Sequence, residues 1–322
     1  MSTTQTMRAI TQRTFGGGEV LEVRDVARPE PLPTEVLVRV HAAGVNPVDW
    51  KTRSGAGMAA VLGEPPFILG WDVSGVVEEI GFGVTTRRPG DAVFGMPWFP
   101  RAAGAYAEYV TAPARQFASK PPSVTHEQAA GVPLAALTAW QSLVDTAEVA
   151  PGQRVMITAA AGGVGHLAVQ VAKHLGAYVI GTASRRNHEW LAALGADEQI
   201  DYTAVRFEEA VDDVDVVIDL VGDAHDSTST RSLAVLRDGG LLVAVPGGVS
   251  PELQAAAQAR GLRVSPFLVE PDGAALRQIS ELIVAGEVTV EIEKTFELEA
   301  AAEAHAQGEA GRTRGKLVLR IA

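Results

Sequence analysis

One stretch of the sequence decides the fold class: Val155-Met156-Ile157-Thr158-Ala159-Ala160-Ala161-Gly162-Gly163-Val164-Gly165. Its first four residues are apolar or β-branched, as in a buried strand, and three glycines then mark a tight turn. Beyond the turn, apolar residues recur at the three- and four-residue spacing of a helix that packs on a sheet. They are Val164, Leu167, Ala168, Val171, Ala172 and Leu175. A strand, a glycine-rich turn and a helix in this order predict the first β-α unit of a Rossmann domain.

The glycines of this turn are spaced to approach a dinucleotide diphosphate. Compared with the pattern G-x-G-x-x-G, Gly162 stands where the backbone approaches the pyrophosphate, and Gly165 where helix and strand pack closely. Ala160 replaces the first glycine, which is a departure from the pattern. We expect Gly162, Gly163, Val164 and Gly165 to bind the phosphates at the helix N-terminus, and the alternative is a purely structural bend.

The tip of the following strand indicates which dinucleotide is bound. An NAD site usually has an acidic residue about 20 positions after the turn, where it accepts from the ribose 2′-hydroxyl. Here that position is Ser184, followed by Arg185 and Arg186. A hydroxyl and a guanidinium bind a 2′-phosphate, so we expect Ser184 and Arg185 to favour NADPH over NADH. The alternative is that the arginines are a solvated helix start.

The chain reads as two domains with different patterns. Residues 129–284 alternate short apolar strands with amphipathic helices, which predicts a doubly wound parallel sheet within an α/β fold. The expected strands are Val155–Thr158, Tyr178–Thr182, Val214–Asp219, Leu241–Val245 and Arg263–Val269. Residues 1–128 and 285–322 carry β-rich runs broken by Gly and Pro, which predict a mostly antiparallel, partly open β-barrel. Thr125 and Gln128 form the pattern of a capping box that opens a helix.

Composition excludes several classes of partner and chemistry. The formal net charge of −12 disfavours a nucleic-acid partner. The absence of cysteine excludes disulfides, a thiol nucleophile and thiolate metal sites, and it fits a reducing cytoplasm. Residues 1–10 lack the apolar region of a secretory signal. The longest uncharged run, Val155–Ala172, contains three glycines and is no membrane span. We therefore expect a soluble cytoplasmic protein that does not bind membranes.

Several collinear motifs across nearly the whole chain resemble one family. They are Gly44-Val45-Asn46-Pro47-Val48-Asp49-Trp50-Lys51, Gly70-Trp71-Asp72, Gly104-Ala105-Tyr106-Ala107-Glu108-Tyr109-Val110, the glycine turn, Leu194-Gly195-Ala196-Asp197, Ile200-Asp201-Tyr202 and Gly315-Lys316-Leu317-Val318-Leu319. The sequence resembles the zinc-independent quinone oxidoreductase (zeta-crystallin-like) branch of the medium-chain dehydrogenase/reductase superfamily. The resemblance implies a Rossmann domain beside a GroES-like, mostly antiparallel β-barrel catalytic domain.

Departures from the zinc alcohol dehydrogenases decide the branch. Asn46 stands where those enzymes place a cysteine ligand, and Trp71 stands where they place a histidine. These positions cannot supply the three ligands of a catalytic zinc, so we expect no metal. No tyrosine has a lysine four residues later, which excludes the catalytic pair of short-chain dehydrogenases.

The resemblance implies metal-free hydride transfer from NADPH to a quinone or an α,β-unsaturated carbonyl. An acceptor of this kind is already electrophilic and needs no Lewis acid. One alternative is a protein that binds NADPH without turnover, as a scaffold or structural protein. A saturated-alcohol dehydrogenase is a further alternative, which the missing zinc ligands disfavour.

The resemblance also implies the catalytic segment, Asn46, Trp50 and Lys51. Asn46 is expected beside the nicotinamide and the acceptor, where its amide donates to the developing oxyanion, unless Asn46-Pro47 is a simple turn. Lys51 hydrogen-bonds cofactor or substrate, or is solvated. Asp49 is interpreted as a helix cap, and Asp72 either as a buried acid beside the site or as a turn residue, with no proton-transfer role assigned.

Further cofactor contacts are expected on scattered segments. By resemblance Thr138 contacts the nicotinamide and Tyr202 lies near the 2′-phosphate, although either can be an ordinary helix or strand-end residue. Pro246 and Gly247 follow a parallel strand at the edge where such sheets bind ligands. Lys316 contacts the cofactor through its main chain or is exposed.

We also expect a homodimer. The strand Arg263–Val269 contains Pro266, which places it at the sheet's edge. An apolar edge invites pairing with another chain, and by resemblance the dimer forms along this edge.

Overall fold

The computed structural model describes residues 5–322, which form two compact units. The β-rich unit comprises residues 5–137 and 270–322, and the Rossmann unit comprises residues 138–269. Residues 129–137 and 270–284, which we expected in the Rossmann domain, thus belong to the β-rich unit. For the second segment the reason is close backbone packing, because a Cβ at Gly273 would lie 2.2 Å from the carbonyl oxygen of Arg115.

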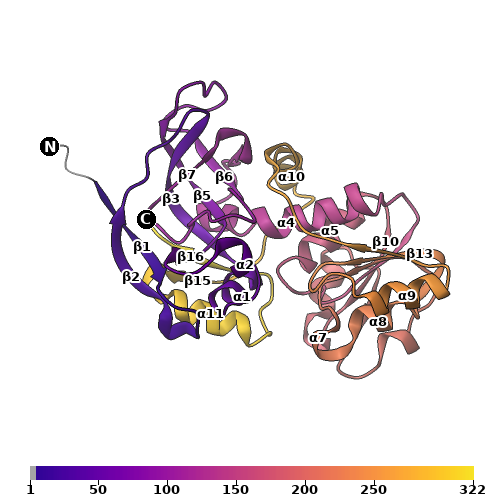
Figure 1. Ribbon diagram of the computed structural model, residues 1–322. Coiled ribbons are helices and arrows are strands. Elements are labelled where there is room, and N and C mark those ends of the chain that lie inside the picture. Colours follow the sequence, from indigo (N-terminus) through magenta and orange to yellow (C-terminus); the bar gives the residue numbers. More distant parts are fainter. Residues whose placement is uncertain (1–4) are drawn as a thin grey trace. The chain divides into compact units, whose positions relative to one another are not determined.

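The strands of the β-rich unit form two sheets (Figure 1). The larger sheet has the order β15-β16-β3-β5-β6-β8, with β7 also paired to β3, and only β15 and β16 run parallel. The smaller has the order β2-β1-β4. The mostly antiparallel pairing is as expected, but among residues 5–322 the strand pairings close no barrel. The strands are β1 (Thr6–Gln12), β2 (Glu22–Ala27), β3 (Glu35–Val45), β4 (Phe67–Ile68), β5 (Asp72–Ile80), β6 (Ala92–Gly95), β7 (Tyr109–Pro113), β8 (Phe117–Ser119), β15 (Ile292–Glu297) and β16 (Lys316–Arg320).

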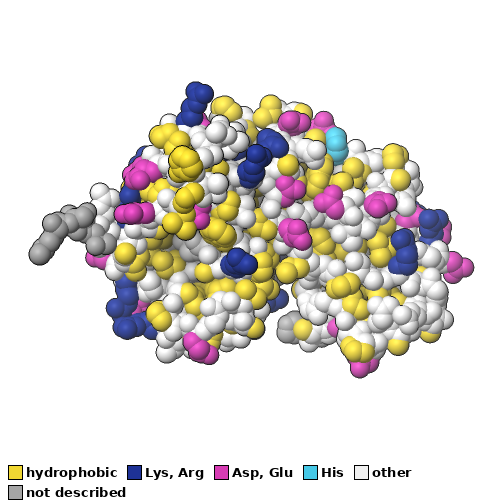
Figure 2. Space-filling model, turned by 45° about the horizontal axis from the view of Figure 1, so that its top comes forward, with side chains coloured by type: hydrophobic (Ala, Val, Ile, Leu, Met, Phe, Trp, Pro, Cys, Tyr) yellow, Lys and Arg dark blue, Asp and Glu magenta, His cyan; other side chains and the backbone are white. Residues whose placement is uncertain are grey.

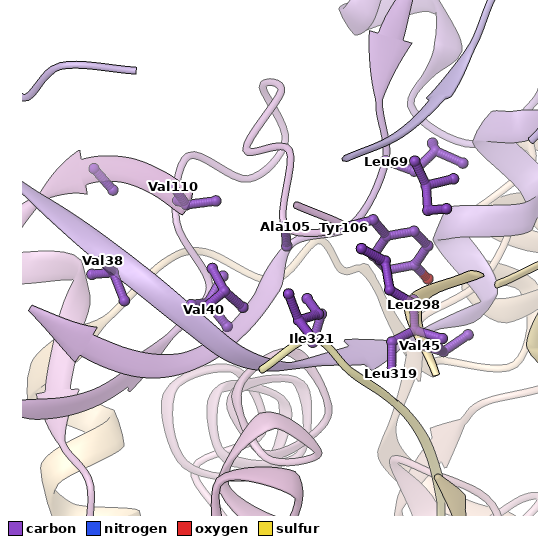
Figure 3. Close-up of a cluster of buried hydrophobic side chains, with 14 of the residues drawn as sticks. Val38, Val40, Val45, Leu69, Ala105, Tyr106, Val110, Leu298, Leu319 and Ile321 are labelled. Atoms are coloured by element: carbon purple, nitrogen blue, oxygen red, sulfur yellow. The ribbon is translucent and has the colours of Figure 1, made fainter. Parts of the chain in front are cut away.

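One apolar core lies against the larger sheet. Val36, Val38 and Val40 lie on the face of β3 that packs into this core, as the two-residue period of a strand requires, and Leu37 on the other face is buried as well. Figure 3 shows part of this cluster, with the ring of Tyr106 beside Leu298. The ring gives the core an apolar body and carries a hydroxyl that needs a buried partner.

The helices of the β-rich unit join these strands. They are α1 (Pro47–Arg53), α2 (Ala59–Leu62), α3 (His126–Ala130), α4 (Pro133–Trp140), α10 (Gly273–Ala285) and α11 (Ala301–Glu309), and α4 continues into the Rossmann unit. The expected capping box opens α3. The Gln128 backbone N–H donates to the Thr125 hydroxyl at 3.2 Å, and the Thr125 N–H donates to the Gln128 side chain at 3.0 Å.

The Rossmann unit contains a six-stranded sheet in the order β11-β10-β9-β12-β13-β14, and all its strands are parallel. If these six strands are numbered from 1 to 6 along the chain, they lie in the sheet in the order 3-2-1-4-5-6. This is the doubly wound arrangement that the sequence predicts. The strands are β9 (Arg154–Ile157), β10 (Tyr178–Thr182), β11 (Glu198–Ile200), β12 (Val214–Asp219), β13 (Leu236–Ala244) and β14 (Arg263–Pro266), and the helices are α5 (Gly165–His174), α6 (His188–Ala193), α7 (Asp223–Asp226), α8 (Thr228–Ser232) and α9 (Pro251–Ala259).

Two features of this sheet bear on function. Strand order reverses between β9 and β12, and parallel sheets bind ligands at the carboxyl ends of the strands beside such a switch point. The outermost strand, β14, ends at Pro266, which confirms the edge position expected from the proline, although the strand is shorter than residues 263–269.

On the face in Figure 2, lysine and arginine side chains lie in separate spots and do not gather into one basic patch. Within the described part of the chain, no helix combines the length and apolar character needed to cross a bilayer.

Candidate functional site

The glycine turn is held at the switch point by β10 and by its own backbone. The N–H of Ala160 donates to the Thr182 carbonyl at 2.9 Å, and the N–H of Gly162 donates to the Ala159 carbonyl at 2.9 Å. A Cβ at Gly165 would lie 2.3 Å from the Ala159 oxygen and 2.7 Å from the Ala160 Cα, closer than packed atoms come. Gly165 therefore lets α5 start directly against the turn, as the sequence pattern predicts.

The departure at Ala160 is accommodated by a glycine on the neighbouring strand. Ala160 is fully buried, and a Cβ at Gly181 would lie only 2.9 Å from the Ala160 methyl carbon. In the described part of the chain, the backbone N–H groups of Gly163 and Val164 have no hydrogen-bond acceptor. These donors precede the first turn of α5, where a helix dipole favours an anion. A diphosphate fits this turn.

Asp219 organises the switch point, and sequence reasoning assigned it no role. Its buried carboxylate accepts the Thr158 hydroxyl at 2.8 Å, the Ser229 hydroxyl at 2.5 Å and the backbone N–H groups of Val221 and Gly222. Thr158 in turn accepts the N–H of Leu220 at 2.8 Å. The carboxylate thus ties the end of β9 to the loop after β12. An acid that ends a strand apolar except for Asp215 was the available signal, because such a carboxylate needs donors when it is buried.

The residues expected at the adenosine end follow β10 and β11. Ser184 occupies the N-cap position of a short 3-10 turn (Arg185–Asn187) without a side-chain capping bond, and the Arg185 side chain is exposed. Tyr202 follows β11 and is 58% exposed, so both side chains can reach a ligand from solvent. The hydroxyl of Thr203, together with backbone N–H groups that include that of Arg185, holds the pKa of Asp201 below its ordinary value.

The remaining expected cofactor residues of this unit lie on separate elements. Pro246 and Gly247 follow β13, next to the loop after β12, since a Cβ at Gly222 would lie 2.8 Å from the Pro246 oxygen. Thr138 lies on α4 and is buried.

In the β-rich unit, three buried polar side chains meet where β3, β5 and β16 lie side by side. Asn46 Nδ2 donates to Asp72 Oδ2 at 2.8 Å, and Lys316 Nζ donates to Asn46 Oδ1 and, at 3.2 Å, to the Val45 carbonyl. The ammonium of Lys316 also lies 3.8 Å from Asp72. Lys316 is thus buried in the β-rich unit, and its side chain is not exposed. Asp72 is the buried acid beside Asn46, which was one of the two expected alternatives.

Asp49 caps helix α1, as expected, and is fully buried. Its Oδ2 accepts the Asn46 backbone N–H at 2.7 Å and the Tyr106 hydroxyl at 2.9 Å. Its Oδ1 has no hydrogen-bond partner within residues 5–322. Burial raises the pKa of Asp49 to about 7, with the Asp72 carboxylate adding to the rise.

A chain of hydrogen bonds continues from Asp49 into α11, and its direction follows from the donors. Arg53 can only donate, so His305 Nδ1 accepts its Nη1 at 3.1 Å, and the protonated Nε2 faces the Tyr106 oxygen at 3.2 Å. Burial lowers the pKa of His305 to about 3, helped by the Arg53 charge, which keeps the ring neutral. The Tyr106 hydroxyl is then left to donate to Asp49. This network fixes α1 and hence the position of Asn46.

Trp50 and Lys51 differ in their surroundings. Trp50 packs against the core, and the centroid of its ring lies 6.1 Å from that of the His305 ring. Its indole also lies close to Gly308, because a Cβ added at Gly308 would be 2.6 Å from it. Lys51 is exposed. Of the three residues expected in the catalytic segment, Asn46 alone joins the buried cluster.

The two positions that would carry zinc ligands in an alcohol dehydrogenase have other contacts here. Trp71 is a core residue that packs edge-on to Phe99 and donates its indole N–H to the Arg101 carbonyl at 2.6 Å. Asn46 is hydrogen-bonded to Asp72 and Lys316. Among residues 5–322, no group of three or more His, Cys, Asp or Glu side chains is arranged to hold a metal ion.

Comparisons with known proteins agree with this arrangement. The alcohol dehydrogenase GroES-like domain model matches residues 32–122, and the zinc-binding dehydrogenase model matches residues 194–319. The NADPH-dependent alkenal/one oxidoreductase of Arabidopsis thaliana chloroplasts is 34% identical over 97% of this chain and 79% of its own length. The quinone oxidoreductase structure from Coxiella burnetii is 40% identical, with a TM-score of 0.93 over 99% of this chain and 100% of that one.

The chain belongs to the zinc-independent quinone oxidoreductase branch of the medium-chain dehydrogenase/reductase superfamily. Another structure of this branch, the Escherichia coli quinone oxidoreductase complexed with NADPH, is 28% identical, with a TM-score of 0.85 over 98% of this chain and 100% of that one. Membership in this branch agrees with the expectation from Asn46 and Trp71, although one matching family model carries the description of a zinc-binding dehydrogenase.

Proposed function

We propose that this quinone oxidoreductase family member is an enzyme that reduces quinones and α,β-unsaturated carbonyls with NADPH. The observation that carries the proposal is the glycine turn at the switch point, where the N–H groups of Gly163 and Val164 have no acceptor among residues 5–322 and where Ser184 and Arg185 stand in place of an acid. The Arabidopsis alkenal/one oxidoreductase and the NADPH complex of the Escherichia coli enzyme support the choice of cofactor and reaction.

The residues proposed to hold the cofactor come from several loops of the Rossmann unit. Gly162, Gly163, Val164 and Gly165 bind the diphosphate, and Ser184, Arg185 and Tyr202 bind the 2′-phosphate end. Thr138, Pro246 and Gly247 are assigned to the nicotinamide side, and any contact from Lys316 is through its main chain.

The chemistry that NADPH supplies when bound is a hydride, which adds to the acceptor carbonyl or β-carbon. Charge then develops on the acceptor oxygen, and a proton completes the reaction. The contribution of the chain is to position the acceptor and to donate a hydrogen bond to that oxygen, which we assign to the amide of Asn46. Trp50 shapes the segment and Lys51 contacts cofactor or substrate.

Following NADPH oxidation at 340 nm tests the proposal. The acceptor panel contains quinones, enones and saturated aldehydes, and each is assayed with and without EDTA. We expect turnover with quinones or enones and no effect of EDTA. Tight NADPH binding without turnover of any acceptor would instead support a non-catalytic NADPH-binding protein, and EDTA-sensitive reduction of a saturated aldehyde would support an alcohol dehydrogenase.

We also propose a homodimer that pairs along β14 and a cytoplasmic location. The outermost position of β14 supports the first proposal, and the absence of cysteine supports the second. Light scattering of the purified protein and of a Val264→Lys variant tests the dimer. A monomeric wild type, or a variant that remains dimeric, would contradict pairing along this strand.

A further inference from the structure

We propose that Lys316 and Asp72 are positioning residues that hold the Asn46 amide in one orientation, so that one of its N–H groups stays directed at the acceptor oxygen. This inference rests on the proposed function and deepens it. It concerns three residues of the β-rich unit alone.

The orientation follows from which groups can donate. A lysine ammonium has only donors, so the Asn46 atom facing Lys316 Nζ is the carbonyl oxygen Oδ1. An aspartate oxygen facing Asn46 at 2.8 Å accepts, so the atom facing Asp72 is Nδ2. A flip of the amide would place Nδ2 against the ammonium and Oδ1 against the carboxylate, which loses both hydrogen bonds. The second hydrogen of Nδ2 is the one left for the acceptor.

The two positioning residues are themselves held from several sides. Asp72 accepts the backbone N–H of Leu134 at 2.8 Å on Oδ1, which leaves Oδ2 for Asn46. Lys316 has the Val45 carbonyl as a second acceptor. A Cβ at Gly44 would lie 2.8 Å from Asp72 Oδ2, so glycine at that position makes room for the carboxylate. Neither side chain can turn away from Asn46 without losing these contacts.

The cluster also strengthens Asn46 as a donor. An ammonium on the amide oxygen draws electrons from the nitrogen, and hydrogen bonds that share one group polarise each other in a buried site. All three side chains are at most 3% exposed, so water does not screen this effect. Burial lowers the pKa of Lys316, while the charges of Asp72 and Asp49 oppose that change.

A mutant cycle separates positioning from folding. Lys316→Met or Asp72→Asn alone leaves a buried charge without its partner and is expected to destabilise the chain, whereas the double variant removes both charges. The variants to compare are Asn46→Ala, Lys316→Met/Asp72→Asn and the triple variant. As a matched control, Glu208→Gln/Arg231→Met removes the ion pair of 2.7 Å between largely buried side chains of the Rossmann unit.

The measurement is kcat and the KM for NADPH, per folded enzyme, with the best quinone or enone of the panel. We expect Asn46→Ala to lower kcat about 100-fold, the loss typical of one oxyanion donor, and the double variant to lower it at least about 10-fold. The triple variant should match Asn46→Ala, because Lys316 and Asp72 act through Asn46. KM for NADPH should stay within about twofold, and the control pair should leave kcat unchanged.

Losses of kcat that multiply in the triple variant would overturn the inference, as would wild-type kcat in the double variant. A wild type that binds NADPH and reduces no acceptor would overturn the proposed function instead. In that case ¹⁵N NMR of the Asn46 side chain still tests the orientation. Nδ2 protons that are protected from exchange with solvent in the wild type and exchange faster in the double variant support it, and equally fast exchange in both proteins refutes it.

Discussion

Gly162 and Gly165 lie three residues apart in the same turn, and the structure gives them different reasons to be glycine. A methyl group at Gly165 would meet three backbone atoms, the Ala159 oxygen at 2.3 Å and the Ala160 Cα and carbonyl carbon at 2.7 and 2.8 Å. Backbone atoms cannot rotate away, so α5 has to shift. Overpacking of this kind costs about 1–3 kcal/mol of unfolding free energy.

A methyl group at Gly162 meets far less of the protein. Apart from the two adjacent residues, the one atom of residues 5–322 within 4 Å of it is the Ala159 oxygen at 3.2 Å, and the φ angle of Gly162 is not positive. Alanine at such a position also loses less entropy on folding, a gain of about 0.4–1 kcal/mol that offsets the tight contact. We therefore expect the unfolding free energy of Gly162→Ala to stay within about 0.5 kcal/mol of wild type.

Although Gly162→Ala is expected to leave the stability of the free protein unchanged, it is expected to weaken the binding of NADPH. If the diphosphate lies against the turn, the methyl group of Gly162→Ala stands between the backbone and the phosphates. We expect its Kd for NADPH to rise at least about tenfold, or about 1.4 kcal/mol, although the free protein is as stable as wild type. Gly165→Ala should lose both stability and affinity. Urea unfolding without ligand and calorimetric titration with NADPH measure the two quantities, and wild-type affinity in Gly162→Ala would refute the placement of the diphosphate.

Three further predictions address the other parts of the site. Arg185→Ala should weaken NADPH about tenfold by loss of a charge-assisted contact and leave NADH unchanged; titration of both cofactors measures this, and equal losses would remove the 2′-phosphate assignment. Burial raises the pKa of Asp49 to about 7, so the folded state holds a proton on this carboxyl more tightly than the unfolded state does. The contribution of this difference to the unfolding free energy is complete below about pH 4 and is lost as the pH rises to about 7. Urea unfolding from pH 5 to 7 should therefore show a contribution from Asp49 of up to about 1.4 kcal/mol per pH unit, and Asp49→Asn should make the decline shallower while Asp72, whose pKa burial also raises, still contributes; an unchanged slope would contradict the raised pKa of Asp49. Gly44→Ala should lower the unfolding free energy by about 1–3 kcal/mol, because its Cβ would lie 2.4 Å from the Ala130 oxygen. If the variant unfolded at the same urea concentration as the wild type, α3 would have moved aside at little cost.

The sequence predicted the parts of the protein that local pattern specifies. The strands Tyr178–Thr182 and Val214–Asp219 were placed at their observed bounds, because each is a mostly apolar run with turn residues at its ends. The three-residue strand β11 was missed, since so short a run carries no period to detect. The expected boundary before residue 285 gave α10 to the Rossmann domain. An amphipathic pattern shows that a helix packs on something, but not on which unit.

The candidate site likewise has one part that local sequence predicts and one part that it does not. The phosphate turn is one contiguous segment whose glycines have local causes, so its sequence is informative by itself. The cluster around Asn46 depends on strand pairing between distant segments. Lys316 was expected to be exposed or to act through its main chain, because nothing near residue 316 in the sequence indicates an acceptor for a buried ammonium.

The pairing of β3 with both its neighbours explains how the cluster forms. β16 runs antiparallel to β3 with Leu317 opposite Val45, so Lys316 reaches the level of Asn46. On the other side, β5 pairs with Gly44 opposite Asp72, after register shifts that include one between Val40 and Ala42. That shift restores the register that an earlier shift between Leu37 and Val38 changes. If it alone were absent, Asp72 would be displaced by one residue along β3, and a one-residue slip sends a side chain to the opposite face of a sheet. The donor geometry at Asn46 is therefore a property of sheet register, set by residues that lie far from it in the sequence.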